Sequence, residues 1–162
     1  MIKQFIGLPG LLANRTAVNF LILMLPVIAC SCSKGTTDPD YSGIADPQAR
    51  WQAYKFESYT IEQIRSCFCA KAGTVFQVVV KNNVIVNVID PATKTPLPEG
   101  ERQWFKTVDQ LFGIVHSVDT ATVAAFQVEY DHKYGYPKNL YVDPSSQMAD
   151  EEYGYGNANL TH

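Results

Sequence analysis

Two short apolar segments separated by a pair of asparagines limit the fold of this chain more than any other feature. Val75–Val80 and Val84–Ile89 are rich in β-branched residues, and Asn82-Asn83 lies between them. β-Branched side chains favour extended backbone, and asparagine tolerates the positive φ of a tight turn. The sequence therefore predicts a β-hairpin. Its nearly continuous apolar character favours a central position in a sheet, covered in part on both faces.

Two helices are predicted from their capping signals. Asp46-Pro47 is an N-cap acceptor followed by proline at the first helical position, which predicts a short helix over Pro47–Tyr54. Thr107 and Gln110 fit a capping box, which predicts a helix over about 108–117. Apolar residues recur in that segment at intervals of three and four, so one apolar stripe is expected to face a sheet. The stripe consists of Val108, Leu111, Phe112 and Val115.

The remaining elements complete an α+β pattern. Asp90–Arg102 contains three prolines and a glycine and is expected to be a loop. Short connections between consecutive strands favour antiparallel pairing. We expect a single antiparallel sheet of about five to six strands, with the main helix at about 107–118 and the short N-terminal helix packed on one face. The last strand is a candidate sheet edge. The further strands are predicted at Phe56–Phe68, Val123–Tyr130, Asn139–Val142 and Tyr153–Asn157.

The N-terminal segment has the features of a bacterial targeting signal. Lys3 and Arg15 precede an apolar run, Ala17–Val27, and no acidic residue occurs in this stretch. The run is too short to span a bilayer as a helix and fits the apolar region of a signal peptide. It ends in Val27-Ile28-Ala29-Cys30, which resembles a lipobox. The resemblance implies that Cys30 is acylated and becomes the first residue after cleavage.

Three other interpretations of this segment stay open. A signal peptide without lipidation would be cut after Ala29. An uncleaved membrane helix is disfavoured because Pro26 interrupts a short apolar core. Lipidation at Cys32 is disfavoured because the residues before it fit a lipobox less well. Several acyl chains on Cys30 would hold the protein firmly, since each buried methylene contributes about 0.8 kcal/mol.

The chain is therefore expected to have three parts. Residues 1–29 are a lipoprotein signal peptide, 30–43 a flexible tether from lipidated Cys30, and 44–162 a single α+β domain. The net charge of the whole chain is −3, and loss of the two basic residues in 1–29 makes it about −5. An acidic surface argues against nucleic acid as a partner. We expect the protein in the cell envelope, lipid-anchored to a bacterial membrane, at the outer membrane or cell surface in preference to the inner membrane.

Several short segments of the domain are together similar to one protein family. They are Ser66–Cys69, Thr107–Phe112, Val128–Asp131, Tyr134–Pro137, Asp143 and Asp150–Tyr153, with the valine-rich hairpin after the first of them. The combination resembles domain-of-unknown-function family 6174, small bacterial lipoproteins and secreted proteins, over about residues 50–157. The resemblance implies the fold and the location in the cell envelope, and it implies no activity. The family often has proline after the second cysteine, where this chain has Ala70.

Cys67 and Cys69 are the only cysteines of the predicted domain. Residues i and i+2 of a strand have Cα atoms about 6.6 Å apart, close to the upper limit of about 6.8 Å for a disulfide. A bridge would therefore need a bend at Phe68, and it would lock the strand end in an oxidising compartment. Metal binding is an alternative, although two thiolates are too few for a closed zinc site. A redox-active dithiol is another, since Arg65 is near, but it needs a lowered thiol pKa and an accessible sulfur. Pairing of Cys67 or Cys69 with Cys32 across the tether is also open, and it would leave one thiol free.

The turn Asp131–Pro137 is the second place where a ligand could bind. Tyr134 and Tyr136 would form a binding edge for a sugar or a peptide if they are exposed. Asp131 and His132 beside Tyr134 could also form an acid–base set. The structural interpretation is favoured, in which Asp131 caps the turn and a glycine takes the positive φ.

The sequence contains no fingerprint of a serine hydrolase elbow, zinc protease, P-loop or dinucleotide fold. We therefore expect a non-catalytic binding module without a cofactor or a metal. Its expected partners are the membrane, through the anchor, and a protein, peptide or glycan ligand. The alternative is a thiol-dependent metal-binding or redox function of Cys67 and Cys69, and a hydrolytic enzyme comes third.

Overall fold

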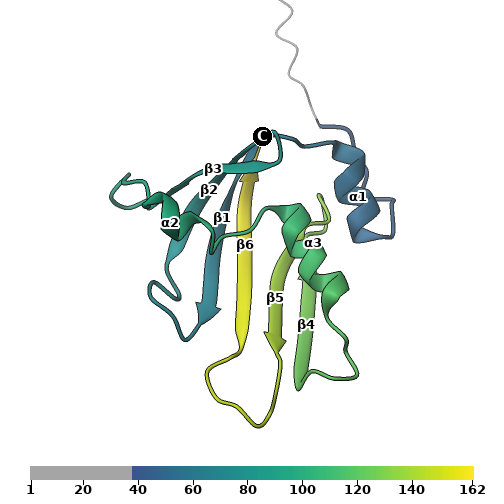
Figure 1. The fold of residues 1–162 in the computed structure, drawn as a ribbon. Helices are drawn as coiled ribbons and strands as arrows, with labels where there is room; N and C mark the ends of the chain where they lie inside the picture. Colours follow the sequence, from purple (N-terminus) through teal and green to yellow (C-terminus); the bar gives the residue numbers. More distant parts are fainter. Residues whose placement is uncertain (1–37) are drawn as a thin grey trace, which may run out of the picture. The chain divides into compact units, whose positions relative to one another are not determined.

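The computed structural model describes residues 38–162, and it confirms the α+β class (Figure 1). Six antiparallel strands form one open sheet in the order β3-β2-β1-β6-β5-β4. The strands are β1 (Tyr59–Cys67), β2 (Val75–Lys81), β3 (Val84–Ile89), β4 (Ala125–Tyr130), β5 (Pro137–Asp143) and β6 (Tyr153–Thr161). The helices are α1 (Pro47–Tyr54), α2 (Glu99–Arg102) and α3 (Val108–Ser117).

The two predicted helices form as their caps indicate. The Asp46 side chain accepts a hydrogen bond from the Ala49 amide, and a proline begins α1. At the start of α3, Thr107 and Gln110 form the complete capping box, each side chain accepting from the other residue's backbone amide. These local bonds satisfy amides that lack a partner within the helix. Both helix starts were therefore predictable from neighbouring residues alone.

The position of the valine-rich hairpin was predicted wrongly. It forms between β2 and β3, but β3 is an edge strand. Val88 is buried, but Val84 and Val86 are exposed, and residues after the strand cover its outer backbone. The Leu97 amide donates to the Val88 carbonyl at 2.8 Å, and Arg102 Nη1 donates to the Val86 carbonyl at 3.1 Å. The edge is thereby protected from pairing with another chain.

Two further predictions need correction. The segment 90–102 is not wholly a loop, because its end forms the single-turn helix α2. The last strand is longer than predicted and lies in the centre of the sheet, where β6 pairs with β1 on one side and β5 on the other. Pairing between strands 90 residues apart leaves no local signal in the sequence. The predicted edge at Tyr153–Asn157 is therefore a central strand.

One face of the sheet carries the hydrophobic core. Buried side chains from β1, β2 and β3 meet α3 there, and Trp51 of α1 packs beside them. Trp51 Nε1 also donates to Asp109 of α3 at 3.0 Å, which ties the two helices together. We call this side the covered face. Its most deeply buried residues include Ile61, Val78, Val80, Val88, Val108, Leu111 and Phe112.

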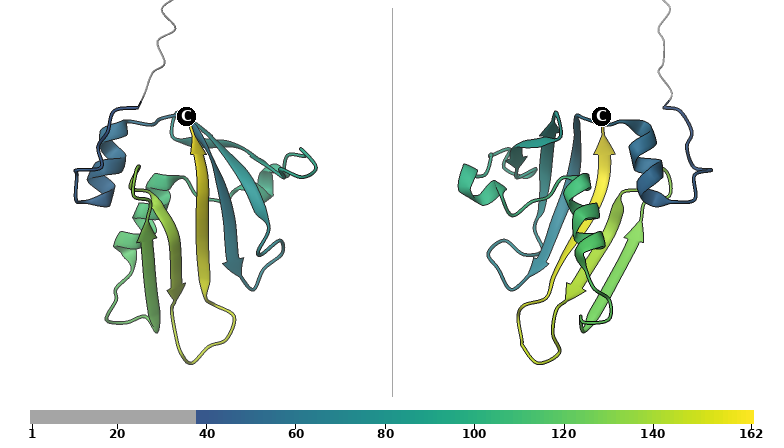
Figure 2. Two further views of the ribbon diagram at one scale, coloured as in Figure 1. Left: turned by 180° about the vertical axis from the view of Figure 1, so that it is seen from behind. Right: turned by 45° about the vertical axis from the view of Figure 1, so that its right-hand side comes forward.

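On the opposite side, which we call the open face, no helix of residues 38–162 covers the sheet. In Figure 1, α2 and α3 lie in front of the strands, and the view from behind shows the strands uncovered (Figure 2, left). The alternate residues of the strands lie on this face. On β1 they are Thr60, Glu62, Ile64 and Ser66, and each lies next to a residue of β6 or β2 in the antiparallel register.

The predicted signal peptide, residues 1–29 with the lipidation site Cys30, lies outside the described residues. The last part of the predicted tether is described, and it contacts the domain. Tyr41 packs edge-on against Tyr54, with ring centroids 4.9 Å apart. Within residues 38–162, no helix has the length and apolar character needed to cross a membrane.

Candidate functional site

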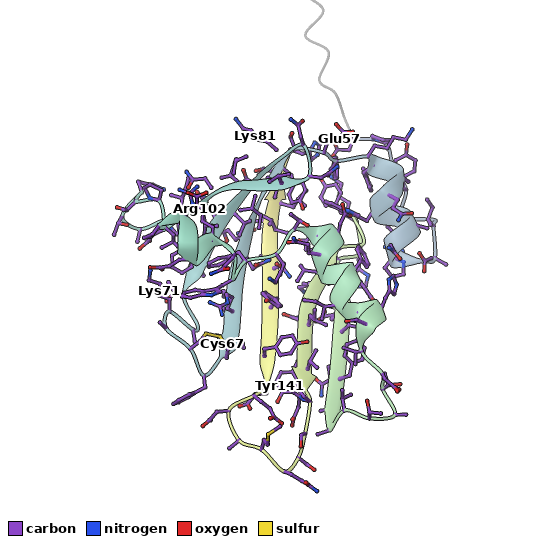
Figure 3. The ribbon with its side chains drawn as sticks, in the orientation of Figure 1. Glu57, Cys67, Lys71, Lys81, Arg102 and Tyr141 are labelled. Carbon is purple, nitrogen blue, oxygen red and sulfur yellow. A yellow bond between two sulfur atoms is a disulfide. The ribbon has the colours of Figure 1, made fainter. Side chains whose placement is uncertain are left out.

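The end of β1 carries a disulfide between Cys67 and Cys69 (Figure 3). Cys67 still pairs with Tyr153 of β6, and the chain then bends so that the Cys69 amide donates to the Cys67 carbonyl at 2.8 Å. The bend brings the two Cα atoms to 5.2 Å, within the range for a disulfide. Among the interpretations of Cys67 and Cys69 that the sequence left open, the structure therefore has the disulfide bond. Within the part of the chain that is described, no cluster of three or more His, Cys, Asp or Glu side chains could hold a metal.

Arg65 lies beside this disulfide. Its Nη2 donates to the Cys67 sulfur at 3.4 Å. Its guanidinium also lies over the Trp104 ring, 5.2 Å from the centroid, so a cation–π contact holds it in place. Phe68, between the two cysteines, is 80% exposed. The strand end therefore presents a disulfide with a fixed cation on one sulfur and an exposed apolar side chain beside it.

The turn Asp131–Pro137 is a structural element. The Asp131 carboxylate accepts hydrogen bonds from the Lys133 and Tyr134 amides, as its predicted capping role requires. Tyr136 is only 5% exposed and belongs to the core, where burial raises its pKa to about 12. Tyr134 is half-buried. The two tyrosines therefore do not form the exposed binding edge that was expected at this turn.

Tyr134 instead belongs to a cluster around Asp38. The Asp38 carboxylate accepts hydrogen bonds from Lys133 Nζ at 3.0 Å and from the Tyr134 hydroxyl at 2.8 Å, and His162 Nε2 lies 3.1 Å from it. The hydrogen bond from Lys133, followed by that from Tyr134, lowers the pKa of Asp38 to about 2. The ring of His162 stacks on Phe56, with centroids 4.2 Å apart. The cluster joins residue 38 and the C-terminal residue to the same turn.

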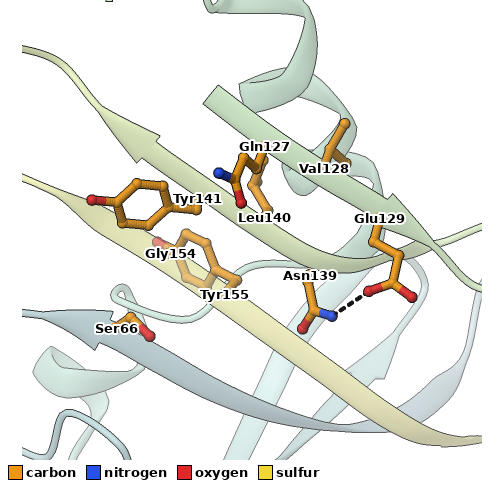
Figure 4. Close-up of a pocket in the computed structure, with 9 residues that line it drawn as sticks. All are labelled: Ser66, Gln127, Val128, Glu129, Asn139, Leu140, Tyr141, Gly154 and Tyr155. Atoms are coloured by element: carbon orange, nitrogen blue, oxygen red, sulfur yellow. Dashed lines mark hydrogen bonds between the residues drawn. The ribbon is translucent and has the colours of Figure 1, made fainter. Parts of the chain in front are cut away.

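Two adjoining hollows form a groove along the central strand β6 on the open face, and Figure 4 shows the residues that line the first of them. Gly154 and Gly156 form its floor, because alternate residues of β6 on this face lack side chains. One hollow of about 450 Å³ lies over β4 to β6, and an adjoining hollow of about 230 Å³ lies towards β1 and β2. Asn139 borders both. The other residues of the first hollow are Ser66, Gln127, Val128, Glu129, Leu140, Tyr141 and Tyr155.

The antiparallel register defines the walls of the groove. Gly156 lies between Ile64 and Asn139, and Gly154 lies between Ser66 and Tyr141. The walls therefore combine an aliphatic side chain, a hydroxyl, a carboxamide and an aromatic ring. This composition suits the recognition of a ligand with both apolar and hydroxyl-bearing surfaces.

Glu129 is the charged group that lines the first hollow, and Glu62 and Lys138 line the adjoining one. The Glu129 carboxylate accepts a hydrogen bond from Asn139 Nδ2 at 2.7 Å and lies 3.5 Å from Lys138 Nζ. The Asn139 hydrogen bond, with the charge of Lys138, lowers the pKa of this carboxyl. Glu129 is therefore ionised at neutral pH, and it fixes the orientation of the Asn139 carboxamide.

The two glycines of the floor differ in whether the surrounding atoms leave room for a side chain. A Cβ atom on Gly154 would lie 2.7 Å from the Leu140 carbonyl oxygen, too close for any other residue without a backbone shift. A Cβ atom on Gly156 would have its nearest neighbours at 3.7 and 3.9 Å, which are ordinary contacts. A strand interior normally disfavours glycine. Gly156 therefore has no packing reason to be glycine, and its effect is to keep the groove open.

The sequence interpretation did not identify this groove. The signal that was present is the pair Gly154 and Gly156, spaced by two within a strand. Residues with that spacing share a face, so two glycines predict a strip without side chains.

Comparison with protein families gives one match. The model of a family described as a family of unknown function (DUF6174) matches residues 44–162. Comparisons with curated proteins and with solved structures give no match.

Proposed function

Because the chain belongs to a family of unknown function (DUF6174), we propose a function from its own residues: it is a lipid-anchored protein of the bacterial envelope that binds a glycan. Its binding surface is the groove on the open face of the sheet. It acts as a binding module and catalyses no reaction at this groove.

The lipid anchor is supported by the sequence Val27-Ile28-Ala29-Cys30, which follows an apolar run of signal-peptide length. Acylation of Cys30 would hold the domain near a membrane through a short connection. This part of the proposal concerns residues outside the described structure, and it is tested separately from the groove.

The observation that carries the binding proposal is Gly156. It lies in the interior of a central strand, where residues with larger side chains are favoured, and its surroundings leave room for a Cβ atom. A residue that weakens a strand without a local structural reason indicates a functional one. The groove that it keeps open is that reason.

The walls of the groove favour a glycan over a peptide. Peptides commonly bind to sheets by pairing with a free strand edge. The groove instead follows β6, whose backbone pairs with β1 and β5 on both sides. The ring of Tyr141 offers an apolar surface, and the Asn139 and Gln127 carboxamides offer donors and acceptors for hydroxyl groups. The charged groups that line the groove are Glu62, Glu129 and Lys138, and their net negative charge favours a neutral sugar chain over an anionic one.

Calorimetric titration of the detergent-solubilised full chain with neutral tetrasaccharides tests the binding proposal. Chitotetraose, cellotetraose and maltotetraose are suitable probes. We expect one of them to bind, and both Tyr141→Ala and Gly156→Val to weaken its binding at least about 10-fold, which corresponds to about 1.4 kcal/mol. Gly113→Ala is the matched control, because its added Cβ atom meets nothing within 4 Å.

Two results would overturn the assignment of the groove to glycans. One is that none of the sugars binds while an extended hexapeptide pool does. The other is that a sugar binds equally well to Gly156→Val, which would place its site elsewhere.

The anchor has its own test. In a bacterial host that processes lipoproteins, Cys30→Ala is expected to abolish the acylated, cleaved form and the partitioning of the protein into the detergent phase. Cys32→Ala is the matched control and is expected to leave both unchanged. An unchanged mass and membrane association of Cys30→Ala would show that Cys30 is not the anchor.

A further inference from the structure

The disulfide between Cys67 and Cys69 contributes little to holding the fold together. It closes a ring with a single residue between the cysteines, and so short a ring removes little entropy from the unfolded chain. Cys67 is already fixed by its pairing with Tyr153 in β6, while Cys69 lies beyond the strand. The bond can therefore open and close without disturbing the sheet, as reversible redox chemistry requires.

The two sulfur atoms have different surroundings. Cys67 is half-buried, and Arg65 Nη2 lies 3.4 Å from its sulfur. Cys69 is exposed to solvent. A guanidinium next to sulfur stabilises the thiolate more than the thiol. On reduction, Cys67 is thus the sulfur that best accommodates negative charge, and Cys69 is the sulfur that an incoming group can reach.

Arg65 is held in this position by contacts that do not depend on the disulfide. Its guanidinium lies over the rings of Trp104 at 5.2 Å and Phe105 at 5.8 Å. Its backbone carbonyl accepts the Gly73 amide at 2.9 Å, which closes the loop that follows the disulfide. The cation is therefore in place before and after the bond opens.

We propose that Cys67 and Cys69 form a thiol–disulfide exchange site that oxidises pairs of thiols in polypeptides. A substrate thiolate attacks the exposed sulfur of Cys69, the bond between Cys67 and Cys69 breaks, and its electron pair goes to the Cys67 sulfur beside Arg65. The second substrate thiolate then attacks the substrate sulfur of the mixed disulfide, the bond from that sulfur to Cys69 breaks, and its electron pair goes to the Cys69 sulfur. The substrate leaves with a disulfide, and Cys67 and Cys69 remain as the reduced pair.

Phe68 gives the site its preference for polypeptides. Its side chain is 80% exposed and lies between the two cysteines, next to the sulfur that is attacked. An exposed apolar side chain in this position can contact the apolar residues of an unfolded chain. The site belongs to a different part of the molecule from the groove, because Arg65 and Cys67 alternate with the residues of β1 that border the open face.

The test measures exchange between the oxidised protein and a synthetic peptide with two cysteines separated by two glycines. The full chain carries Cys30→Ser and Cys32→Ser and is solubilised in detergent, so that the only reactive sulfurs are those of Cys67 and Cys69. The oxidised free peptide Ser-Cys-Phe-Cys-Ala is the reference, because it has the same ring without Arg65. We expect the protein to react at least about 10-fold faster than this peptide, since a leaving thiol of lower pKa leaves faster.

Substitutions then isolate the role of the cation. Arg65→Met is expected to remove most of the rate advantage. Arg65→Lys keeps the positive charge and is expected to retain part of the advantage, which distinguishes the effect of charge from a loss of packing. Lys71→Met is the matched control, because Lys71 forms an ion pair with Glu101 instead of a contact with sulfur. It is expected to change the rate less than about twofold.

A second measurement does not depend on the substrate. With Cys69→Ser, the single thiol of Cys67 is expected to titrate well below the ordinary pKa of about 8.5, and with Cys67→Ser the thiol of Cys69 is expected to titrate close to it. The ultraviolet absorbance of the thiolate, followed against pH, measures both thiol pKa values. Equal titration of the two thiols, or an exchange rate equal to that of the free peptide, would overturn the proposal.

Discussion

Ile61 and Ile64 of β1 show how different the two faces of the sheet are. Ile61 lies on the covered face, opposite Val78, and is 0% exposed. Ile64 lies on the open face, beside Gly156, and is half-buried. The same strand thus places one isoleucine in a packed core and the other at the wall of a groove. The comparison indicates that the covered face provides the stability of the domain and that the open face is free to bind.

Truncation of the same residue type on each face is expected to have very different effects on stability. Ile61→Ala is expected to lower the free energy of unfolding by about 2–5 kcal/mol, because it leaves a cavity in a packed core. Ile64→Ala is expected to cost less than about 1 kcal/mol, because solvent already reaches the side chain. Urea unfolding followed by circular dichroism measures both variants.

Similar losses at the two positions would contradict the assignment of stability to one face. They would mean that another part of the protein, or a second molecule, covers the open face in solution. The m-value of urea unfolding reports the surface that unfolding exposes, so a changed m-value would indicate instead that the substitution altered the unfolded state.

The covered face also contains a buried polar residue. Gln63 is 0% exposed on the covered face, where its Nε2 donates to Asn157 Oδ1 at 2.8 Å and to the Lys106 carbonyl at 3.1 Å. Its Oε1 accepts the Lys106 amide at 2.9 Å. These bonds join β1 to β6 and to the segment that precedes α3.

Gln63→Leu is expected to lower the free energy of unfolding by about 1–3 kcal/mol, because it leaves the buried Asn157 Oδ1 and the half-buried backbone groups of Lys106 without these partners. Gln77→Leu is the matched control, since Gln77 lies on the open face of β2. It is expected to change stability by less than about 0.5 kcal/mol. A neutral Gln63→Leu would indicate that water reaches this site and replaces the lost bonds.

The fold was predictable wherever neighbouring residues determine it. The cap at Asp46 and the capping box of Thr107 and Gln110 define two helices, and Asn82-Asn83 defines the hairpin turn. The order of the strands was not predictable in the same way. It depends on which distant strands pair, and the protection of β3 by Leu97 and Arg102 is also a tertiary contact.

The candidate site was less predictable than the fold. Tyr136 was expected at a binding edge because aromatic residues in turns are often exposed, but its ring completes the core. Arg65 was expected near the cysteines because it precedes Cys67 by two residues in the sequence. The groove depends on two residues without side chains, Gly154 and Gly156. Its existence follows only once the strand order places these glycines between β1 and β5.

The two glycines of the open face differ in what an added methyl group is expected to cost. Gly154→Ala is expected to lower the free energy of unfolding by about 1–3 kcal/mol, because its Cβ atom would lie 2.7 Å from the Leu140 carbonyl oxygen. Gly156→Ala is expected to leave stability unchanged or to raise it by up to about 1 kcal/mol, because alanine restricts the unfolded chain more than glycine does. Thermal and urea unfolding of the two variants, compared under one set of conditions, measure the difference.

A stable Gly156→Ala variant would have a clear meaning. The fold would then tolerate a side chain at this position, and the glycine would have to be explained by what occupies the space above it. A loss of stability as large as that of Gly154→Ala would instead mean that packing requires both glycines. In that case the groove would be a consequence of strand spacing, and Gly156 would no longer support a ligand on the open face.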